Sequence, residues 1–378
     1  MAGERLFRVI GVYYGREVAI CQIAPTRLTQ PQPRYSPVHR ANAIYPLTFT
    51  PVLRDYIWGG RRLATLYGRS LPPGAIAESW EISGHPAGST AADAGWWAGR
   101  SLPEILAELG RDLVGEHADW SLARDRFPLL VKLLDANQDL SVQVHPDDTY
   151  ALAHEGGELG KTEMWYVLHA EPGAELIHGL AGGVTAESLR AALAAGQVEK
   201  VLRRTPIGAG QAVSVPAGTV HALLRGVVVA EIQQNSDTTY RVHDWGRLAA
   251  DGKPRALHVE KALEVIAFGQ QPPAIVAPRP LHDCADLVRS ELARNRYFVV
   301  ERVTLARGQE FTGVCDGSTL EIWGCVAGEA VVVWAGGSVS LPAIRYALLP
   351  AILGEFTVSA SAMATCLRVY LPADAPAE

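Results

Sequence analysis

The feature that most constrains this chain is a series of short apolar strands, separated by glycine and proline turns, between residues 127 and 234. Leu140–His145 shows the pattern most clearly, because apolar and polar side chains alternate strictly along it. The 36 glycines and 24 prolines make up about 16% of the residues, somewhat above the usual ~12%. We therefore predict a mainly β, antiparallel fold of the jelly-roll kind. The other expected strands are Phe127–Leu134, Thr162–Leu168, Gly173–His178, Gln211–Val215, Thr219–Leu224 and Val227–Gln233.

Three segments break the strand pattern and predict a few added helices. Ser101-Leu-Pro-Glu104 is a capping box with a proline just inside the helix start, and it predicts a helix as far as about Leu113. Thr185 is expected to cap a second helix, with apolar residues at helical spacing as far as Leu202. A third helix is expected at His258–Phe268.

Composition divides the chain into four parts. Residues 1–40 contain several prolines and an apolar stretch too short and too charged for a signal peptide, so we expect a loosely structured N-terminal extension. Residues 41–270 form the first β domain with its helical segments, and the proline-rich stretch 271–281 forms a linker. Residues 282–378 are again β-rich, and a short stretch within them that begins at Arg345 weakly resembles Gln211–Gly218. This similarity predicts two related jelly-roll barrels. Because the only histidine of the second block is His282, at the linker, we expect no metal site there.

Charge and cysteine usage exclude several classes of protein. The chain has 34 Lys and Arg against 40 Asp and Glu, a formal net charge of −6, which argues against nucleic acid or an anionic membrane as a partner. No apolar run approaches the roughly 18 residues that cross a bilayer. The five cysteines form no CxxC pair, so neither a disulfide framework nor a thiolate zinc site is indicated. We expect a cytoplasmic protein.

One set of polar residues has the composition of a metal site. Gln143 and His145 lie two apart on one strand and so project from the same face, while Glu163 lies on another expected strand. Lys161 shares the face of Glu163, and His221 follows a Pro-Ala-Gly turn. Two imidazoles, a carboxylate and an amide oxygen suit zinc, and also Fe(II), Mn(II) or Co(II). Either histidine alone is more often a turn or core residue, so this prediction depends on their combination.

Two further polar features interrupt apolar strands. Lys132 lies within Pro-Leu-Leu-Val-Lys-Leu-Leu, where an ammonium must reach solvent from a strand end or line a pocket as a cation for an anionic substrate. The polar run from Gln233 to Arg241 follows an apolar strand directly. It is either a solvated loop or a segment that holds Asp237 and Arg241 at a barrel mouth, where arginine would clamp phosphate or a developing oxyanion.

Together these motifs resemble one family, the type I mannose-6-phosphate isomerases in their short bacterial form. The likeness runs from about Tyr45 to the end of the chain, is weaker after the linker, and has all motifs in the family's order. The stretches that carry it are Asp55-Tyr-Ile-Trp-Gly-Gly60, Glu78-Ser-Trp-Glu-Ile-Ser-Gly-His-Pro86, Leu129-Leu-Val-Lys-Leu-Leu-Asp-Ala136, Leu140-Ser-Val-Gln-Val-His-Pro-Asp-Asp148, Gly160-Lys-Thr-Glu-Met-Trp-Tyr166, Val215-Pro-Ala-Gly-Thr-Val-His-Ala222 and Gln233-Gln-Asn-Ser-Asp-Thr-Thr-Tyr-Arg241.

The resemblance implies a cupin fold and a zinc-dependent interconversion of mannose 6-phosphate and fructose 6-phosphate through a cis-enediol. It implies one Zn²⁺ per chain, bound by Gln143, His145, Glu163 and His221. The implied catalytic residues are Arg241, Lys161 and Asp237, and the implied substrate-binding residues are Lys132 and Ser141. A bound metal would act as a Lewis acid, Arg241 would stabilise developing negative charge, and Lys132 with Ser141 would anchor the phosphate.

Several alternatives stay open at this stage. The base could be Asp237, Lys161 or a metal-bound hydroxide. A non-haem iron oxygenase uses a similar two-histidine, one-carboxylate set, and a non-catalytic sugar-binding cupin is a third possibility. A phosphorylated hexose is the expected partner, with no nucleic acid and no membrane, and we expect a monomer or weak homo-oligomer.

Overall fold

The computed structural model describes residues 10–13, 16–19, 44–248, 252–269, 273–283 and 287–373. The chain divides into two compact units, residues 1–41 and residues 42–378. In the first unit, β1 (Ile10–Tyr13) pairs with β2 (Arg16–Ala19) as an antiparallel hairpin. The prolines on which the expected extension depends lie outside the described residues, as do Cys21 and Cys284. The proposed domain boundaries remain predictions.

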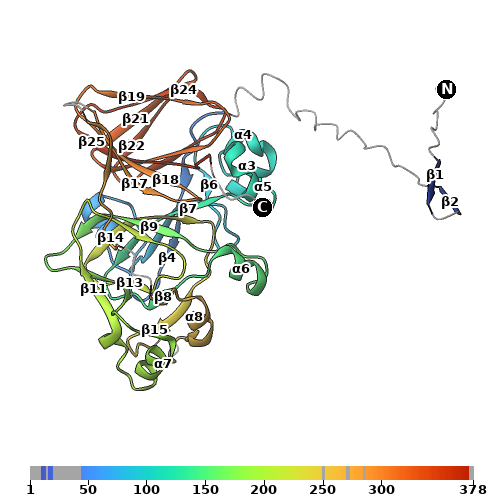
Figure 1. Cartoon of the computed structure of the whole chain (residues 1–378). Helices are drawn as coiled ribbons and strands as arrows, with labels where there is room; N and C mark the ends of the chain where they lie inside the picture. The colour runs from blue at the N-terminus through green and yellow to red at the C-terminus, as the bar shows by residue number, and fades with distance from the viewer. Residues whose placement is uncertain are drawn as a thin grey trace. The chain divides into compact units, whose positions relative to one another are not determined.

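Two antiparallel sheets face each other in the first half of the larger unit. The five-stranded sheet has the order β11-β10-β13-β8-β15, and the six-stranded sheet has the order β12-β9-β14-β7-β5-β4. Figure 1 labels β8, β11, β13 and β15 of the first sheet and β4, β7, β9 and β14 of the second. The strands of the first are β8 (Val142–Val144), β10 (Glu175–Leu180), β11 (Leu202–Pro206), β13 (His221–Leu223) and β15 (Tyr240–His243). Those of the second are β4 (Val52–Arg54), β5 (Glu78–Ser83), β7 (Leu129–Ala136), β9 (Glu163–Ala170), β12 (Ala212–Val215) and β14 (Val227–Gln234).

The second half of this unit is again two antiparallel sheets. Their orders are β16-β17-β18-β25-β20-β23 and β19-β24-β21-β22. The first comprises β16 (Arg279–Asp283), β17 (Leu287–Arg294), β18 (Val299–Leu305), β20 (Glu321–Ala327), β23 (Tyr346–Leu349) and β25 (Ala364–Tyr370). The second comprises β19 (Glu310–Cys315), β21 (Glu329–Trp334), β22 (Gly337–Pro342) and β24 (Gly354–Ser359), and the short β3 (Phe49–Thr50) pairs with β6 (Ala91–Ala92).

The helices bear out the predicted caps but not every predicted end. Ser101 caps α3 with a complete capping box, but the helix stops at Gly110 and α4 begins after it. Thr185 caps α7, which ends at Ala194, so the residues toward Leu202 belong to η2 and β11 instead. The helices are α2 (Arg62–Tyr67), α3 (Leu102–Leu109), α4 (Arg111–Val114), η1 (Glu116–Ala118), α5 (Asp119–Leu122), α6 (Asp148–His154), α7 (Ala186–Ala194), η2 (Val198–Val201) and α8 (Val259–Val265).

Burial on both faces explains why β7 is a continuous apolar run. Its residues Leu129, Val131 and Leu133 pack in one cluster with Phe298 and other residues of the second half. Leu134, on the opposite face, packs into a separate cluster between the two sheets of the first half. A strand covered on both faces needs apolar residues at nearly every position, so the lysine at position 132 is a real exception.

The prediction of a mainly β fold with antiparallel sheets and a few helices is confirmed. Every strand pair among the described residues is antiparallel. The division into two closed barrels remains a prediction. For function, the important consequence is that two sheets of the first half bring strands distant in sequence face to face.

Candidate metal centre and adjoining pocket

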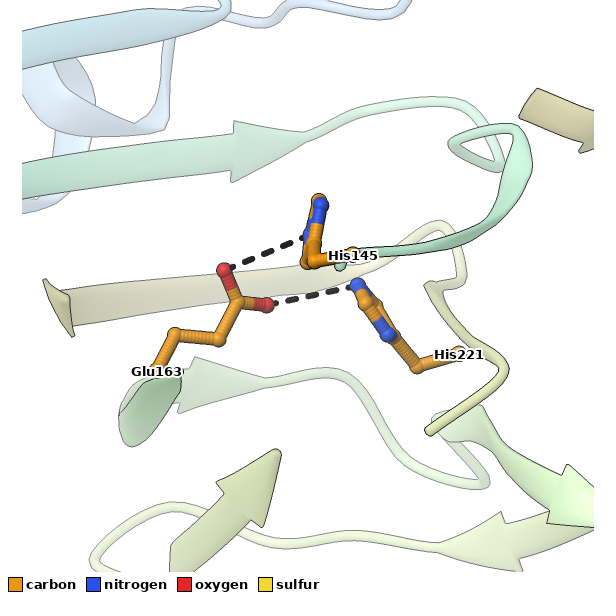
Figure 2. Close-up of side chains that lie close together, drawn as sticks. All are labelled: His145, Glu163 and His221. Carbon is orange, nitrogen blue, oxygen red and sulfur yellow. Dashed lines mark ion pairs between the residues drawn. The ribbon is translucent and has the colours of Figure 1, made fainter. Parts of the chain in front are cut away.

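Two histidines and a glutamate meet between the two sheets of the first half (Figure 2). His221 begins β13 of the five-stranded sheet, and His145 directly follows the end of β8 in the same sheet. Glu163 begins β9 in the facing six-stranded sheet. The alternation along each strand points all three side chains into the space between the sheets, where each is at most 1% exposed.

The donor atoms of this triad lie close enough to share one cation. Nε2 of His221 lies 3.3 Å from Oε1 of Glu163, and Nε2 of His145 lies 3.6 Å from Oε2 (Figure 2). One ligand atom from each residue lies within 4.8 Å of the others. Oε1 of Glu163 is buried without a hydrogen-bond donor among the described residues, which is costly unless a cation binds nearby, and Oε2 faces the ammonium of Lys161 at 2.9 Å.

Backbone carbonyls fix the tautomer of both histidines. Nδ1 of His145 lies 2.8 Å from the carbonyl oxygen of Thr238, and Nδ1 of His221 lies 2.8 Å from that of Thr219. Because a carbonyl oxygen only accepts, each Nδ1 carries the proton and donates it. Each Nε2 therefore presents its lone pair toward Glu163, which is how metal-binding histidines are usually oriented.

Burial controls the protonation of the triad. Desolvation lowers the pKa of His221 to about 3, and it lowers the pKa of His145 well below its ordinary value, assisted by the charge of Lys161. Desolvation also raises the pKa of Glu163 to about 7, against the opposing influence of Lys161. Neutral imidazoles are the form that binds metals, so at neutral pH both histidines are ready to act as ligands.

Gln143 and Lys161 extend the triad toward solvent. The side-chain amide of Gln143 lies 3.2 Å from Nε2 of His221, its register partner on the neighbouring strand. Rotating this amide by half a turn exchanges its nitrogen and oxygen, so Gln143 can present either a donor or a metal ligand. The ammonium of Lys161, 4% exposed, lies 2.9 Å from Oε2 of Glu163 and 3.1 Å from Nε2 of His145.

A pocket of about 220 Å³ opens beside the triad and collects most of the predicted site residues. Both sheets contribute to its wall. The triad adjoins the pocket through Gln143 and Lys161, which line the wall and contact His221, His145 and Glu163. Six predicted residues line it: Lys132, Ser141, Gln143, Lys161, Asp237 and Arg241. All nine residues nominated from the sequence therefore lie in the pocket wall or in the adjacent triad.

Neither interpretation of the sequence included the three carboxylates that surround Lys132. The side chain is 3% exposed, so it does not reach solvent from a strand end, and it does line the pocket. Its Nζ lies 3.6 Å from Glu231, 3.9 Å from Glu78 and 4.0 Å from Asp237, and 4.7 Å from the centre of the Trp80 ring. Burial would lower the pKa of Lys132, but the three carboxylates outweigh it and raise the pKa.

The polar run from Gln233 to Arg241, which begins in the last two residues of β14, is not a solvated loop. Gln233, Gln234, Asn235 and Ser236 are all 0% exposed, so the first part of the run is interior. The amide of Gln233 donates hydrogen bonds to the carbonyl oxygens of Gln234 and Ser236, 2.7 and 2.6 Å away. These bonds stabilise the turn that brings the rest of the run to the pocket, where Asp237 is 43% exposed at the wall.

Sequence reasoning missed three charged residues of the pocket wall: Glu78, Glu231 and Arg255. Glu231 lies inside the apolar run Val227–Ile232, so the signal that identified Lys132 was also available there. Glu78 lies in a stretch used only for the resemblance. Arg255 lies after β15 in a segment with no periodic pattern, and no sequence signal marks it.

The fold and the site thus define a β-sheet protein with a candidate two-histidine, one-glutamate metal centre at the base of a charged pocket. The donor set fits a divalent metal such as zinc, because it combines two neutral imidazole nitrogens with a buried carboxylate. None of the helices in the described residues is long and apolar enough to cross a membrane.

Comparisons with known proteins specify the family. A family model described as phosphomannose isomerase type I, catalytic domain, matches residues 47–168. A mannose-6-phosphate isomerase of Bacillus subtilis is 39% identical over 335 residues, which are 86% of this chain and 99% of that protein. A mannose-6-phosphate isomerase of Streptococcus mutans is 45% identical over 233 residues, 62% of this chain and 71% of that protein.

The solved structures agree with the sequence comparisons. The crystal structure of the mannose 6-phosphate isomerase from Bacillus subtilis superposes with a TM-score of 0.77 at 34% identity, covering 86% of this chain and 99% of that one. This chain therefore belongs to the type I phosphomannose isomerase family. The predictions of this family and of an isomerase enzyme are confirmed.

Proposed function

We propose that this protein interconverts mannose 6-phosphate and fructose 6-phosphate, through a cis-enediol, with one divalent metal ion, zinc by expectation, per chain. Family membership supports the reaction, since the relatives over most of its length are named mannose-6-phosphate isomerases. The observation that carries the metal requirement is the buried triad of His145, Glu163 and His221. Its lone pairs converge, and Oε1 of its carboxylate has no hydrogen-bond donor in the described part of the chain.

The metal would be held by the triad together with Gln143. When bound, it supplies a Lewis acid that polarises the sugar oxygens next to the carbon from which the proton is removed. The residues around it have separate tasks. The carbonyl oxygens of Thr238 and Thr219 keep both imidazoles in the ligating tautomer, and burial keeps both neutral.

The reaction itself moves a proton between two adjacent carbons. A base removes the proton from C2 of the aldose, and the C1–C2 double bond of the enediol forms as O1 takes up a proton. A proton is then returned to C1 as O2 loses its proton and becomes the carbonyl oxygen of the ketose. Lys161 and Asp237 both line the pocket and are the candidate bases. The permanently charged Arg241, in the same wall, is suited to bind negative charge on the substrate.

Lys132 and Ser141 are the proposed substrate-binding residues. Both are almost completely buried, and both line the pocket. Fixed donors at such positions orient C1 and C2 relative to the base, and orientation supplies a large share of the rate enhancement of many enzymes.

The deciding experiment is a coupled assay of fructose 6-phosphate formation by the purified full chain. Activity should disappear after treatment with a chelator and return with added zinc, and a His145→Ala variant should lose both metal content and turnover. His154→Ala, which removes an exposed histidine that neither belongs to the triad nor lines the adjoining pocket, is the control and should keep both. Full activity of the metal-free wild type would refute the metal requirement, and oxygen uptake without isomerisation would favour an iron oxygenase.

A further inference from the structure

The pocket has an acidic side, supplied by the six-stranded sheet and the turn after it. Lys132 is surrounded there by Glu78, Glu231 and Asp237 at 3.6 to 4.0 Å, so one positive charge faces three carboxylates. A phosphate ester carries a charge of about −1.5 to −2 at neutral pH. Placing it against Lys132 would add two negative charges to a group that is already net negative. This end of the pocket is better suited to neutral sugar hydroxyls.

The opposite side of the pocket is basic. Arg241 on β15 and Arg255 in the segment before α8 both line it. Arg255 donates two hydrogen bonds to the carboxylate of Asp244, and Arg247 donates to the same carboxylate. Arg241 has no carboxylate within ion-pair distance among the described residues; one of its nitrogens donates to the carbonyl oxygen of Ala256. Two guanidinium groups therefore share one carboxylate, and the third, that of Arg241, has none in the part of the chain that the structure describes.

We propose that Arg255, together with Arg241, binds the phosphoryl group of the substrate; this rests on the proposed function. Guanidinium groups present paired N–H donors that match phosphate oxygens and do not lose their charge at physiological pH. Their net charge with Asp244 and Arg247 is positive, opposite to that of the ligand. Asp244 holds the guanidinium of Arg255 in place, so less conformational entropy is lost when the ligand binds.

Strand register gives the substrate a direction. His221, Gln143 and Arg241 are direct partners across β13, β8 and β15, which places them in one row on the same face of the sheet. Adjacent strands lie about 4.8 Å apart, so the backbone of Arg241 is about 10 Å from that of His221. A hexose 6-phosphate has its reacting carbons and its phosphate at opposite ends. The metal triad and the arginine pair can thus receive the two ends together.

The test compares arginines that share a carboxylate but differ in their access to the pocket. Arg255→Ala removes a pocket residue, and Arg247→Ala removes a neighbour that does not line the pocket while leaving Asp244 paired. At fixed ionic strength, Arg255→Ala should raise the KM for mannose 6-phosphate on the order of tenfold to a hundredfold, with a smaller change in kcat. It should also weaken competitive inhibition by inorganic phosphate, and Arg255→Lys should restore part of it.

The outcomes separate this proposal from the proposed function. Equal effects of Arg255→Ala and Arg247→Ala, or KM and phosphate inhibition within twofold of wild type in Arg255→Ala, would overturn the phosphate subsite while isomerisation continued. If the wild type proved inactive as an isomerase, titration calorimetry with inorganic phosphate would still decide. Saturable binding that Arg255→Ala abolishes would support the subsite, and absence of binding to the wild type would refute it.

Discussion

Lys132 offers the sharpest prediction about stability, because one buried ammonium holds three carboxylates together. It is 3% exposed, and its Nζ lies within 4.0 Å of Glu78, Glu231 and Asp237. Lys132→Met keeps the length and most of the volume of the side chain but removes the charge. The carboxylates of Glu78 and Glu231, both inside the fold, would then repel each other without a cation between them.

The size of the effect follows from the burial of this group. Removing one partner of a buried ion pair typically costs about 3–5 kcal/mol. An unfolding entropy of about 2.1 cal/mol/K per residue gives roughly 0.7 kcal/mol/K for a unit spanning residues 42–378. The expected decrease in Tm at neutral pH is therefore about 4–7 °C.

The effect should depend on pH, with a definite sign. Burial already raises the pKa of Glu78, and Lys132 opposes that rise, so the substitution should raise this pKa further. A carboxyl group whose pKa is higher in the folded than in the unfolded state contributes stability at low pH that is lost as pH rises. The deficit of Lys132→Met should therefore be smaller near about pH 5 than near about pH 8.

Thermal unfolding of metal-matched protein across this pH range is the measurement. Lys200→Met, at an exposed lysine, is the control and should leave Tm nearly unchanged. Adding Glu231→Gln to Lys132→Met should recover part of the loss, because it removes one of the uncompensated charges. A Tm of Lys132→Met within about 1 °C of the wild-type Tm at neutral pH would correspond to a stability change below roughly 0.7 kcal/mol. That result would show that these carboxylates do not depend on the lysine.

Two further predictions concern Glu163 of the metal centre and the close backbone packing at Gly160. Glu163→Gln should lower metal affinity, and turnover with it, by at least the roughly 10–100-fold that is typical of losing an outer-shell partner. Metal analysis after dialysis measures the loss. The control is Glu175→Gln on β10, which should retain wild-type metal content. Gly160→Ala should destabilise the fold by about 1–3 kcal/mol, because a Cβ there would lie 2.4 Å from backbone atoms of Asp147 and Asp148. Gly182→Ala, where a Cβ meets nothing within 4 Å, should be neutral in the same denaturant titration, and an equal loss in both variants would refute this account.

Local patterns in the sequence determined the strands and the residue types of the site. Strict alternation identified the strand that contains Gln143, although β8 is shorter than predicted and ends just before His145, and the apolar run of β7 made Lys132 conspicuous. Capping residues identified the starts of α3 and α7, because caps satisfy backbone donors within a few residues. The helix ends were less predictable, since Gly110 and the residues after Ala194 end the helices despite continued apolar spacing.

Only the tertiary structure decided which of these residues meet and with what charge around them. His145 and Glu163 lie on facing sheets, and Gln143 contacts His221 because β8 pairs with β13, a pairing set by sheet topology rather than by local periodicity. The same holds for the three carboxylates around Lys132 and for Arg255. Electrostatic environment depends on distance through space, and residues far apart in the chain reveal that distance only once the sheets have packed.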